Sequence, residues 1–249
     1  ARRAPSLGNP TAAMLVIGDE ILSGRTRDAN MHHLAGLLAE AGIDLKEVRV
    51  VSDDRDAIVA AVNALRRAFT HVFTSGGIGP THDDITADAI AAAFAAPIGV
   101  RDDARAILQA HYDREGIELN EARLRMARIP EGATLIDNPV SAAPGFTLGN
   151  VHVMAGVPAI FAAMAAGLLP TLRGGAPVVS RSLRVDLPEG EIAGPLGALA
   201  ARHPELSFGS YPFQRDGRFG ANIVIRGQDG DAVALAADAL AAELRGIRA

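Results

Sequence analysis

The stretch SGGIGPTHDDIT, from Ser75 to Thr86, places three glycines and two adjacent aspartates directly after an apolar run. Glycines adopt backbone conformations that a side chain forbids, so successive N–H groups of such a turn can converge on an anion. A helix expected from Thr86 adds its positive end. We therefore predict a phosphate site. Its expected ligand-binding residues are Ser75, Gly76, Gly77, Gly79 and Thr81.

Asp83 and Asp84 conflict with this phosphate site, because bare carboxylates repel phosphate. A divalent cation held by one or two carboxylates and by phosphate oxygens removes the conflict. Mg²⁺ is the expected ion, with Mn²⁺ or Co²⁺ as alternatives. Glu20, in the loop after the first expected strand, offers a further ligand oxygen. The predicted metal ligands are thus Asp83, Asp84 and Glu20.

A structural interpretation of the same stretch stands beside this one. Glycine-rich turns after strands are common connectors, and Asp83, Asp84 or Thr86 is then simply the N-cap of the following helix. The stretch is not a dinucleotide fingerprint, because His82 stands where the third glycine belongs. A Walker-type lysine is absent from it as well.

Composition narrows the class of partner. The net charge is −5, from 24 Lys and Arg against 29 Asp and Glu, so we expect no nucleic-acid partner. Cysteine is absent, which excludes disulfides, thiolate metal sites and a cysteine nucleophile, and favours a cytoplasmic address. The longest apolar segment, residues 151–170, is interrupted by Gly156, Pro158 and Gly167, so no membrane span is expected.

Short apolar strands alternate with helices of 3.6-residue periodicity in the first part of the chain. This alternation predicts an α/β fold of three layers, with helices on both faces of a mainly parallel sheet. A strand order of 2-1-3 would place the loops after the first and third strands across one crevice. The expected strands are 12–17, 45–51 and 71–74, and the expected helices are 30–41, 58–69 and 86–94.

The pattern of expected helices and strands changes in the rest of the chain. A long helical region over 101–126 is broken at Gly116, two short strands flank Gly149 and Asn150, and a helix follows over 159–169. The Pro/Gly-rich segment 170–178 is the expected domain boundary. We expect a flexible leader over 1–11, a ligand-binding domain over 12–170, and a small α+β module over 178–249.

Four motifs in order resemble the molybdopterin-binding domain family, and most closely its version at the N-terminus of CinA-type, competence/damage-inducible proteins. They are GDEILSG (18–24), SGGIGPTHDDIT (75–86), NPVSAAPGF (138–146) and GVP (156–158). The tail resembles the module that follows this domain in CinA-type chains. No counterpart of their deamidase domain precedes the last residue, Ala249, so deamidation is not expected.

The resemblance implies a three-layer fold, a homo-oligomer (dimer or trimer), and a nucleotide or pterin phosphate over the glycine turn. It also implies that Asp83 or Asp84 is catalytic, with Glu20 and Asp28 in the facing loop. One departure is the segment Ala159–Phe161, where the family commonly has Glu-Met. The motifs add these expected ligand-binding residues: Gly18, Asn138, Pro144, Gly145, Gly156 and Pro158.

The resemblance implies one leading activity, the metal-dependent hydrolysis of a nucleotide pyrophosphate such as ADP-ribose. Two alternatives remain open: a binding module for molybdopterin or a nucleotide in molybdenum cofactor biosynthesis, and adenylyl transfer to molybdopterin. All three need a small-molecule partner that carries phosphate.

Overall fold

A computed structural model describes residues 8–215 and 217–247 of the chain. The chain divides into two units, the first ending at Gly175 and the second beginning at Ala176. The leader expected over residues 1–11 lies outside the described residues up to residue 7. Thr11 is already the first residue of a strand.

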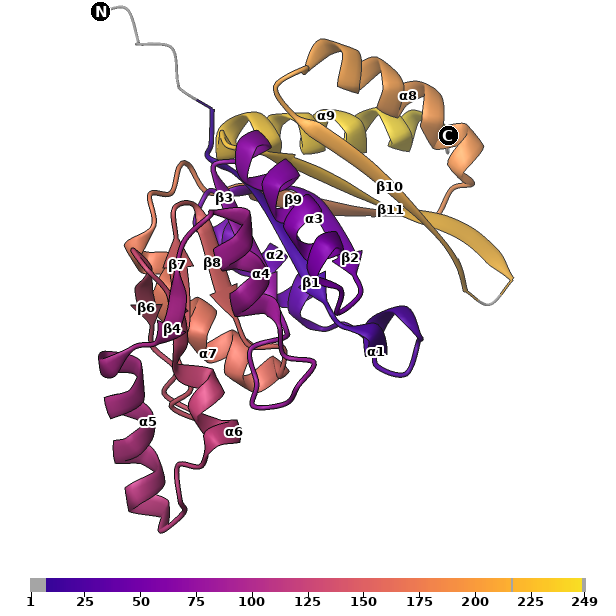
Figure 1. Cartoon of the computed structure of the whole chain (residues 1–249). Coiled ribbons are helices and arrows are strands. Elements are labelled where there is room, and N and C mark those ends of the chain that lie inside the picture. The colour runs from indigo at the N-terminus through magenta and orange to yellow at the C-terminus, as the bar shows by residue number, and fades with distance from the viewer. Residues whose placement is uncertain (1–7, 216, 248–249) are drawn as a thin grey trace, which may run out of the picture. The chain divides into compact units, whose positions relative to one another are not determined.

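The first unit is built on a six-stranded sheet with the order β2-β1-β3-β8-β7-β6 (Figure 1). β1 pairs in parallel with β2 and β3, and β3 pairs in parallel with β8, whereas β7 is antiparallel to both of its neighbours. The predicted α/β class, mainly parallel sheet and 2-1-3 order are confirmed. The strands are β1 (Thr11–Ile17), β2 (Asp44–Val51), β3 (His71–Ser75), β6 (Thr134–Ile136), β7 (Gly145–Leu148) and β8 (Val151–Met154).

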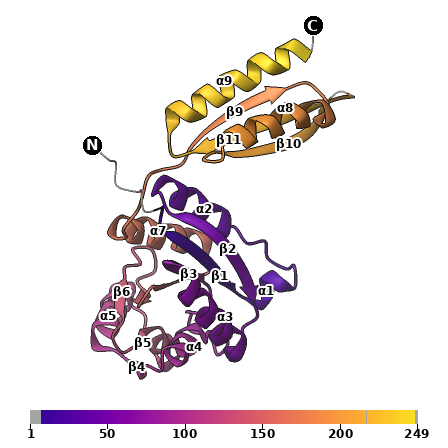
Figure 2. The same cartoon turned by 90° about the horizontal axis from the view of Figure 1, so that it is seen from above.

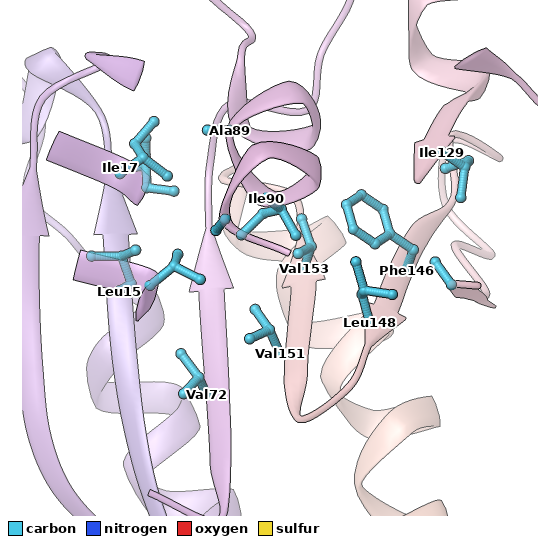
Figure 3. Packing of buried hydrophobic residues seen from close by; sticks show 14 of the residues in the cluster. Leu15, Ile17, Val72, Ala89, Ile90, Ile129, Phe146, Leu148, Val151 and Val153 are labelled. Atoms are coloured by element: carbon cyan, nitrogen blue, oxygen red, sulfur yellow. The ribbon is translucent and has the colours of Figure 1, made fainter. Parts of the chain in front are cut away.

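Side chains alternate across the sheet because successive residues of a strand point to opposite faces. Leu15 and Ile17 of β1 pack with α3 (Arg55–Ala68) and α4 (Thr86–Ala93) on one face. Figure 3 shows both residues on the side where Ile90 of α4 lies. Met14 packs with α2 (Asn30–Glu40) and α7 (Pro158–Leu168) on the other face (Figure 2). The sheet is therefore the middle layer of three.

The helical region expected over 101–126 is broken at Gly116 as predicted, and it is less regular beyond that break. It contains α5 (Asp102–Glu115), which ends at Gly116 with φ +65°, then α6 (Glu121–Leu124) and a 3₁₀ turn, η1 (Arg125–Ala127). The residues between Gly116 and Glu121 are not helical. A two-stranded sheet of β4 (Ile98–Val100) and β5 (Arg128–Pro130) flanks this region. β4, β5 and β6 were not predicted, because three residues are too few to show a period.

The second unit is an α+β module, the class expected from the sequence. Its antiparallel sheet has the order β10-β11-β9, and both helices share one buried cluster with it (Figure 2). In the described part of the chain, no helix has the length and apolar content of a membrane span. The elements are β9 (Val179–Val185), α8 (Glu189–Arg202), β10 (Ser207–Arg215), β11 (Arg218–Gly227) and α9 (Gly230–Ile247).

Candidate functional site

The candidate site lies at the carboxyl ends of β1 and β3, which are neighbours in the sheet. The loop after β1 contains a short helix, α1 (Asp19–Leu22), and the loop after β3 is the glycine turn, Ser75 to Gly79. Adjacent parallel strands bring their following loops to the same edge, where ligands of open α/β sheets bind. The two loops that carry the predicted chemistry therefore meet at one edge.

Two glycines of the glycine turn are required by its geometry. Gly76 has φ +106°, and a Cβ there would lie 2.2 Å from the carbonyl oxygen of Ile17. Gly77 has φ +70°, and a Cβ there would lie 2.1 Å from Oγ1 of Thr86. Both backbone angles are positive and both neighbours are close, so only glycine fits either position.

Thr86 fixes the glycine turn to the start of α4. Its hydroxyl donates to the Gly76 carbonyl at 2.9 Å, and its backbone N–H donates to the Gly77 carbonyl at 3.0 Å. Thr86 is fully buried. Both hydrogen bonds engage carbonyl groups of the turn and fix its conformation. The Gly76 N–H itself donates to the Met154 carbonyl at 3.2 Å, so the N–H groups offered to an anion are those that follow Gly76.

Asp84 folds back onto its own loop. Its Oδ2 accepts hydrogen bonds from both the backbone N–H and the hydroxyl of Thr81. It does not cap α4: the N-cap is Ile85, and no side chain caps this helix. The expectation that Asp83, Asp84 or Thr86 is the N-cap was wrong, because the local hydrogen bonds of Asp84 close an earlier turn.

A buried asparagine that the sequence analysis missed connects three segments of the site. Nδ2 of Asn30, the first residue of α2, donates to Oγ of Ser75 at 2.7 Å and to the Gly156 carbonyl at 2.8 Å. A Cβ on Gly156 would lie 3.2 Å from Cα of Gly76. The predicted residues Ser75, Gly76 and Gly156 are thus brought together, and Asn30 holds them. Nothing local marks this residue, since its partners are 45 and 126 positions away.

Replacing Asn30 with alanine is expected to lower the free energy of unfolding of the first unit by about 2–3 kcal/mol. The change leaves the buried Ser75 hydroxyl and the Gly156 carbonyl without their donor, and each unsatisfied group costs about 1–3 kcal/mol. Urea unfolding measures the loss. The control is Asn63→Ala, which removes a half-buried acceptor on α3 and is expected to cost less than about 1 kcal/mol. Equal losses in the two variants would contradict the connecting role of Asn30.

Asp53, just after β2, is a second residue that the sequence analysis missed. Its Oδ2 accepts a hydrogen bond from the backbone N–H of Asp19 at 2.9 Å. Burial raises the pKa of Asp53; the hydrogen bond from Asp19 opposes this rise, and the negative charges of Asp19, Glu20 and Asp83 add to it. Acidic side chains from the loops after β1, β2 and β3 therefore act on one another at this edge.

Replacing Asp53 with asparagine is expected to raise the Tm at pH 7. The raised pKa means that the folded state binds the Asp53 proton more tightly than the unfolded state, so the stability contributed by this group is complete below its ordinary pKa near 3.8 and is lost as the pH rises through the folded-state value. The gain over the wild type should shrink below about pH 4. Calorimetry from pH 3 to pH 8 measures it, and Asp56→Asn, at an exposed position on α3, is the control. A gain in Tm that is independent of pH would contradict the raised pKa of Asp53.

The described residues contain no group of three or more His, Cys, Asp or Glu side chains placed to hold a metal ion. The predicted ligands Asp83, Asp84 and Glu20 are therefore not gathered into a preformed site. Mg²⁺ often takes only one or two carboxylates and completes its shell with water and substrate phosphate oxygens. A divalent cation at this edge would therefore need further oxygen ligands from water or phosphate.

Some of the other predicted residues have structural contacts. Oδ2 of Asp28 accepts a hydrogen bond from Met31 N at 2.9 Å, so Asp28 caps α2 from one position before the Ala29 N-cap. Asn138 is buried, and it bonds four groups of its own loop, including Val140 N and Ser141 N. Both side chains shape loops at this edge.

The remaining predicted residues are glycines and prolines. Gly18 is buried and donates to the Val51 carbonyl at 3.1 Å. Gly145 passes close to β8, because a Cβ there would lie 2.2 Å from the Val153 carbonyl oxygen. Pro158 is the exposed first residue of α7. These residues set the path of the chain at this edge.

A small hollow of about 20 Å³ adjoins the glycine turn. A volume near this size holds about one water molecule. It combines two predicted motifs, the glycine turn and the 138–146 loop, with cationic side chains that the sequence analysis did not consider. Its lining includes Gly77, Gly79, Asp84, Arg125, Arg128 and Pro144.

Comparison with protein families matches almost the whole chain. A family described as a probable molybdopterin binding domain matches residues 13–174, and a family described as the middle domain of FAD synthase matches residues 177–248. The two matches meet where the two units meet.

Curated relatives carry both kinds of name. A CinA-like protein of Desulfosudis oleivorans is 34% identical over 80% of this chain and 51% of its own length. A probable FAD synthase of Caenorhabditis briggsae is 32% identical over 93% of this chain and 49% of its own length. The chain thus spans about half the length of each of these relatives.

One solved structure supports the fold directly. The crystal structure of the protein CinA from Thermoplasma acidophilum, described as of unknown function, matches with a TM-score of 0.60 and 32% identity. The match covers 65% of this chain and 97% of the solved one.

Proposed function

Because the chain belongs to the molybdopterin-binding domain family, we propose that its glycine turn binds a phosphate of a nucleotide or pterin, and that the protein hydrolyses a nucleotide pyrophosphate such as ADP-ribose. The observation that carries the proposal is the turn itself. Gly76 and Gly77 have positive φ angles, and Thr86 donates to the carbonyl groups of both, so the path of the turn and the direction of the N–H groups after Gly76 are fixed. A fixed cradle of N–H groups at a helix start is suited to phosphate.

In this proposal a divalent cation, Mg²⁺, Mn²⁺ or Co²⁺, arrives with the substrate. Asp83, which is exposed beside the glycine turn, would supply a carboxylate, with Asp84 or Glu20 as a second one. When bound, the cation neutralises negative charge that develops on the phosphate oxygens. The acidic character of the edge disfavours phosphate without a cation, so hydrolysis is expected to depend on the metal.

The protein's own residues then position the reacting groups. The glycine turn holds one phosphate, and Glu20 or Asp28 in the facing loop orients a water molecule toward phosphorus. The water oxygen forms the new P–O bond, the anhydride P–O bond breaks, and the water proton passes to a carboxylate or to solvent. ADP-ribose would yield AMP and ribose 5-phosphate.

A second candidate is a binding module that holds molybdopterin or a nucleotide with little turnover. It is favoured by the finding that the described carboxylates form no preformed metal site. This binding module is expected to bind its ligand stoichiometrically without forming a product.

A third candidate function is adenylyl transfer to molybdopterin. Complementation of a strain that lacks this activity would detect it.

The deciding experiment incubates the full chain with ADP-ribose and Mg²⁺, Mn²⁺ or Co²⁺, with an EDTA control, and follows AMP by chromatography. Release of AMP only with metal supports hydrolysis. Calorimetric binding of ADP-ribose or of a pterin phosphate without product supports the binding module. If the protein neither binds nor hydrolyses these ligands, the phosphate site itself is wrong. Light scattering of the same sample tests the predicted dimer or trimer.

A further inference from the structure

Arg125 lies at the start of η1 and lines the hollow beside Gly77 and Gly79. Its Nε is shielded from solvent and has no hydrogen-bond partner among the described residues. No ion pair of Arg125 is found among them either. Guanidinium groups are always charged in proteins, and a shielded donor without an acceptor costs free energy. The hollow therefore contains a cationic group that lacks an anionic partner.

Neighbouring arginines differ from Arg125 in this respect. Arg128, which lines the same hollow, forms an ion pair with Asp88. Arg101 pairs with Asp103 and donates to the Ala133 carbonyl. Both guanidiniums thus have acceptors within the protein. Arg125 is half-buried, and its shielded Nε has no such acceptor among the described residues.

The size of the hollow limits what this acceptor can be. About 20 Å³ admits one oxygen atom of a ligand but not a whole phosphate group. A phosphate at the mouth of the hollow would reach Arg125 with one oxygen and would adjoin the glycine turn. Arginine is well suited to such contacts, because its fork of N–H donors matches phosphate oxygens.

We propose that Arg125 binds the second phosphate of a ligand whose first phosphate lies on the glycine turn, so that the site selects nucleoside diphosphates and their esters over monophosphates. This inference rests on the proposed function and specifies its substrate class. Arg125 borders the turn through the hollow, whereas Asp53, Asp19 and Glu20 lie in the loops after β2 and β1. A diphosphate is therefore directed toward the Arg125 guanidinium and away from the Asp53 carboxylate.

Calorimetric titration of AMP and ADP into the full chain, with Mg²⁺ and with EDTA in separate runs, tests the proposal. The wild type is expected to bind ADP at least about 10-fold more tightly than AMP, because a hydrogen bond to a charged group contributes about 1.5–3 kcal/mol. Arg125→Gln is expected to weaken ADP binding about 10-fold to 100-fold and AMP binding less than about 3-fold. Arg125→Lys, which keeps the charge without the fork, should fall between the two.

Arg105→Gln, which removes the same charge from an exposed position on α5, is the matched control and should change neither affinity. The Tm of Arg125→Gln should equal or exceed that of the wild type, since the change removes a shielded donor without an acceptor. Equal weakening of AMP and ADP, or a fall in Tm with both affinities lowered, would assign Arg125 a structural role and overturn the inference. A wild type that binds neither nucleotide would instead contradict the proposed function.

Discussion

Replacing Gly76 with alanine is expected to destabilise the first unit by about 2–5 kcal/mol and to abolish phosphate binding. The new Cβ would lie 2.2 Å from the carbonyl oxygen of Ile17, a backbone atom at the end of β1. The φ of +106° adds strain for any residue with a side chain. A positive φ costs about 1–2 kcal/mol and overpacking about 1–3 kcal/mol.

Gly36→Ala is the control for this variant. Gly36 lies within α2, where an added Cβ would meet no heavy atom within 4 Å. Alanine is the better helix former, so this change should stabilise the unit by about 0.5–1 kcal/mol. Calorimetry measures both variants, and hydrogen exchange of the β1 and β3 amides assigns the loss to the first unit. If Gly76→Ala matched Gly36→Ala, the turn would have a geometry different from the one described.

Much of the fold is predictable from local pattern alone. The run Ala12–Ile17 is apolar at every position because β1 is covered on both faces, and the four-residue spacing of Leu34 and Leu38 indicates the buried face of α2. Both signals lie within a single element, so they can be recognised without knowledge of its neighbours. The short strand β5 has no such signal, and it is defined by its pairing with β4.

The glycine turn was predictable for the same reason, whereas the groups around it were not. Gly76 and Gly77 can be recognised from the sequence because only glycine tolerates their backbone angles. Asn30, Asp53 and Arg125 are ordinary polar residues in sequence. Their importance comes from tertiary neighbours: the buried Ser75 hydroxyl for Asn30, like charges for Asp53, and the absence of a described acceptor for Arg125 Nε.

The charges around the glycine turn are therefore distributed unevenly. Burial raises the pKa of Asp53, and the negative charges of acidic residues from the loops after β1 and β3 add to this rise. Arg125 borders the hollow next to Gly77 and Gly79. A single phosphate could sit on the turn without using this asymmetry. In the proposed complex a diphosphate would use both parts, because Arg125 would neutralise one phosphate while a cation beside Asp83 would neutralise the other.

Replacing Asp83 with asparagine is expected to lower metal-dependent AMP release on the order of 100-fold, because the proposed cation loses a charged ligand. The Tm should not change measurably, since the Asp83 side chain is 61% exposed. Asp84→Asn should show the opposite pattern. Its Oδ2 is already engaged by two donors of Thr81, so this change is expected to lower stability by about 1 kcal/mol and activity less than about 10-fold.

Thr81→Val separates the two aspartates further. This variant removes the hydroxyl that donates to Asp84 but keeps the backbone N–H, so it should reproduce the stability loss of Asp84→Asn and leave the metal dependence intact. Initial rates across a Mn²⁺ titration, together with calorimetric Tm values, measure all three variants. Should Asp84→Asn lose as much activity as Asp83→Asn while Thr81→Val retains it, Asp84 would be the metal-binding carboxylate, and its contact with Thr81 would have to open when the ligand binds.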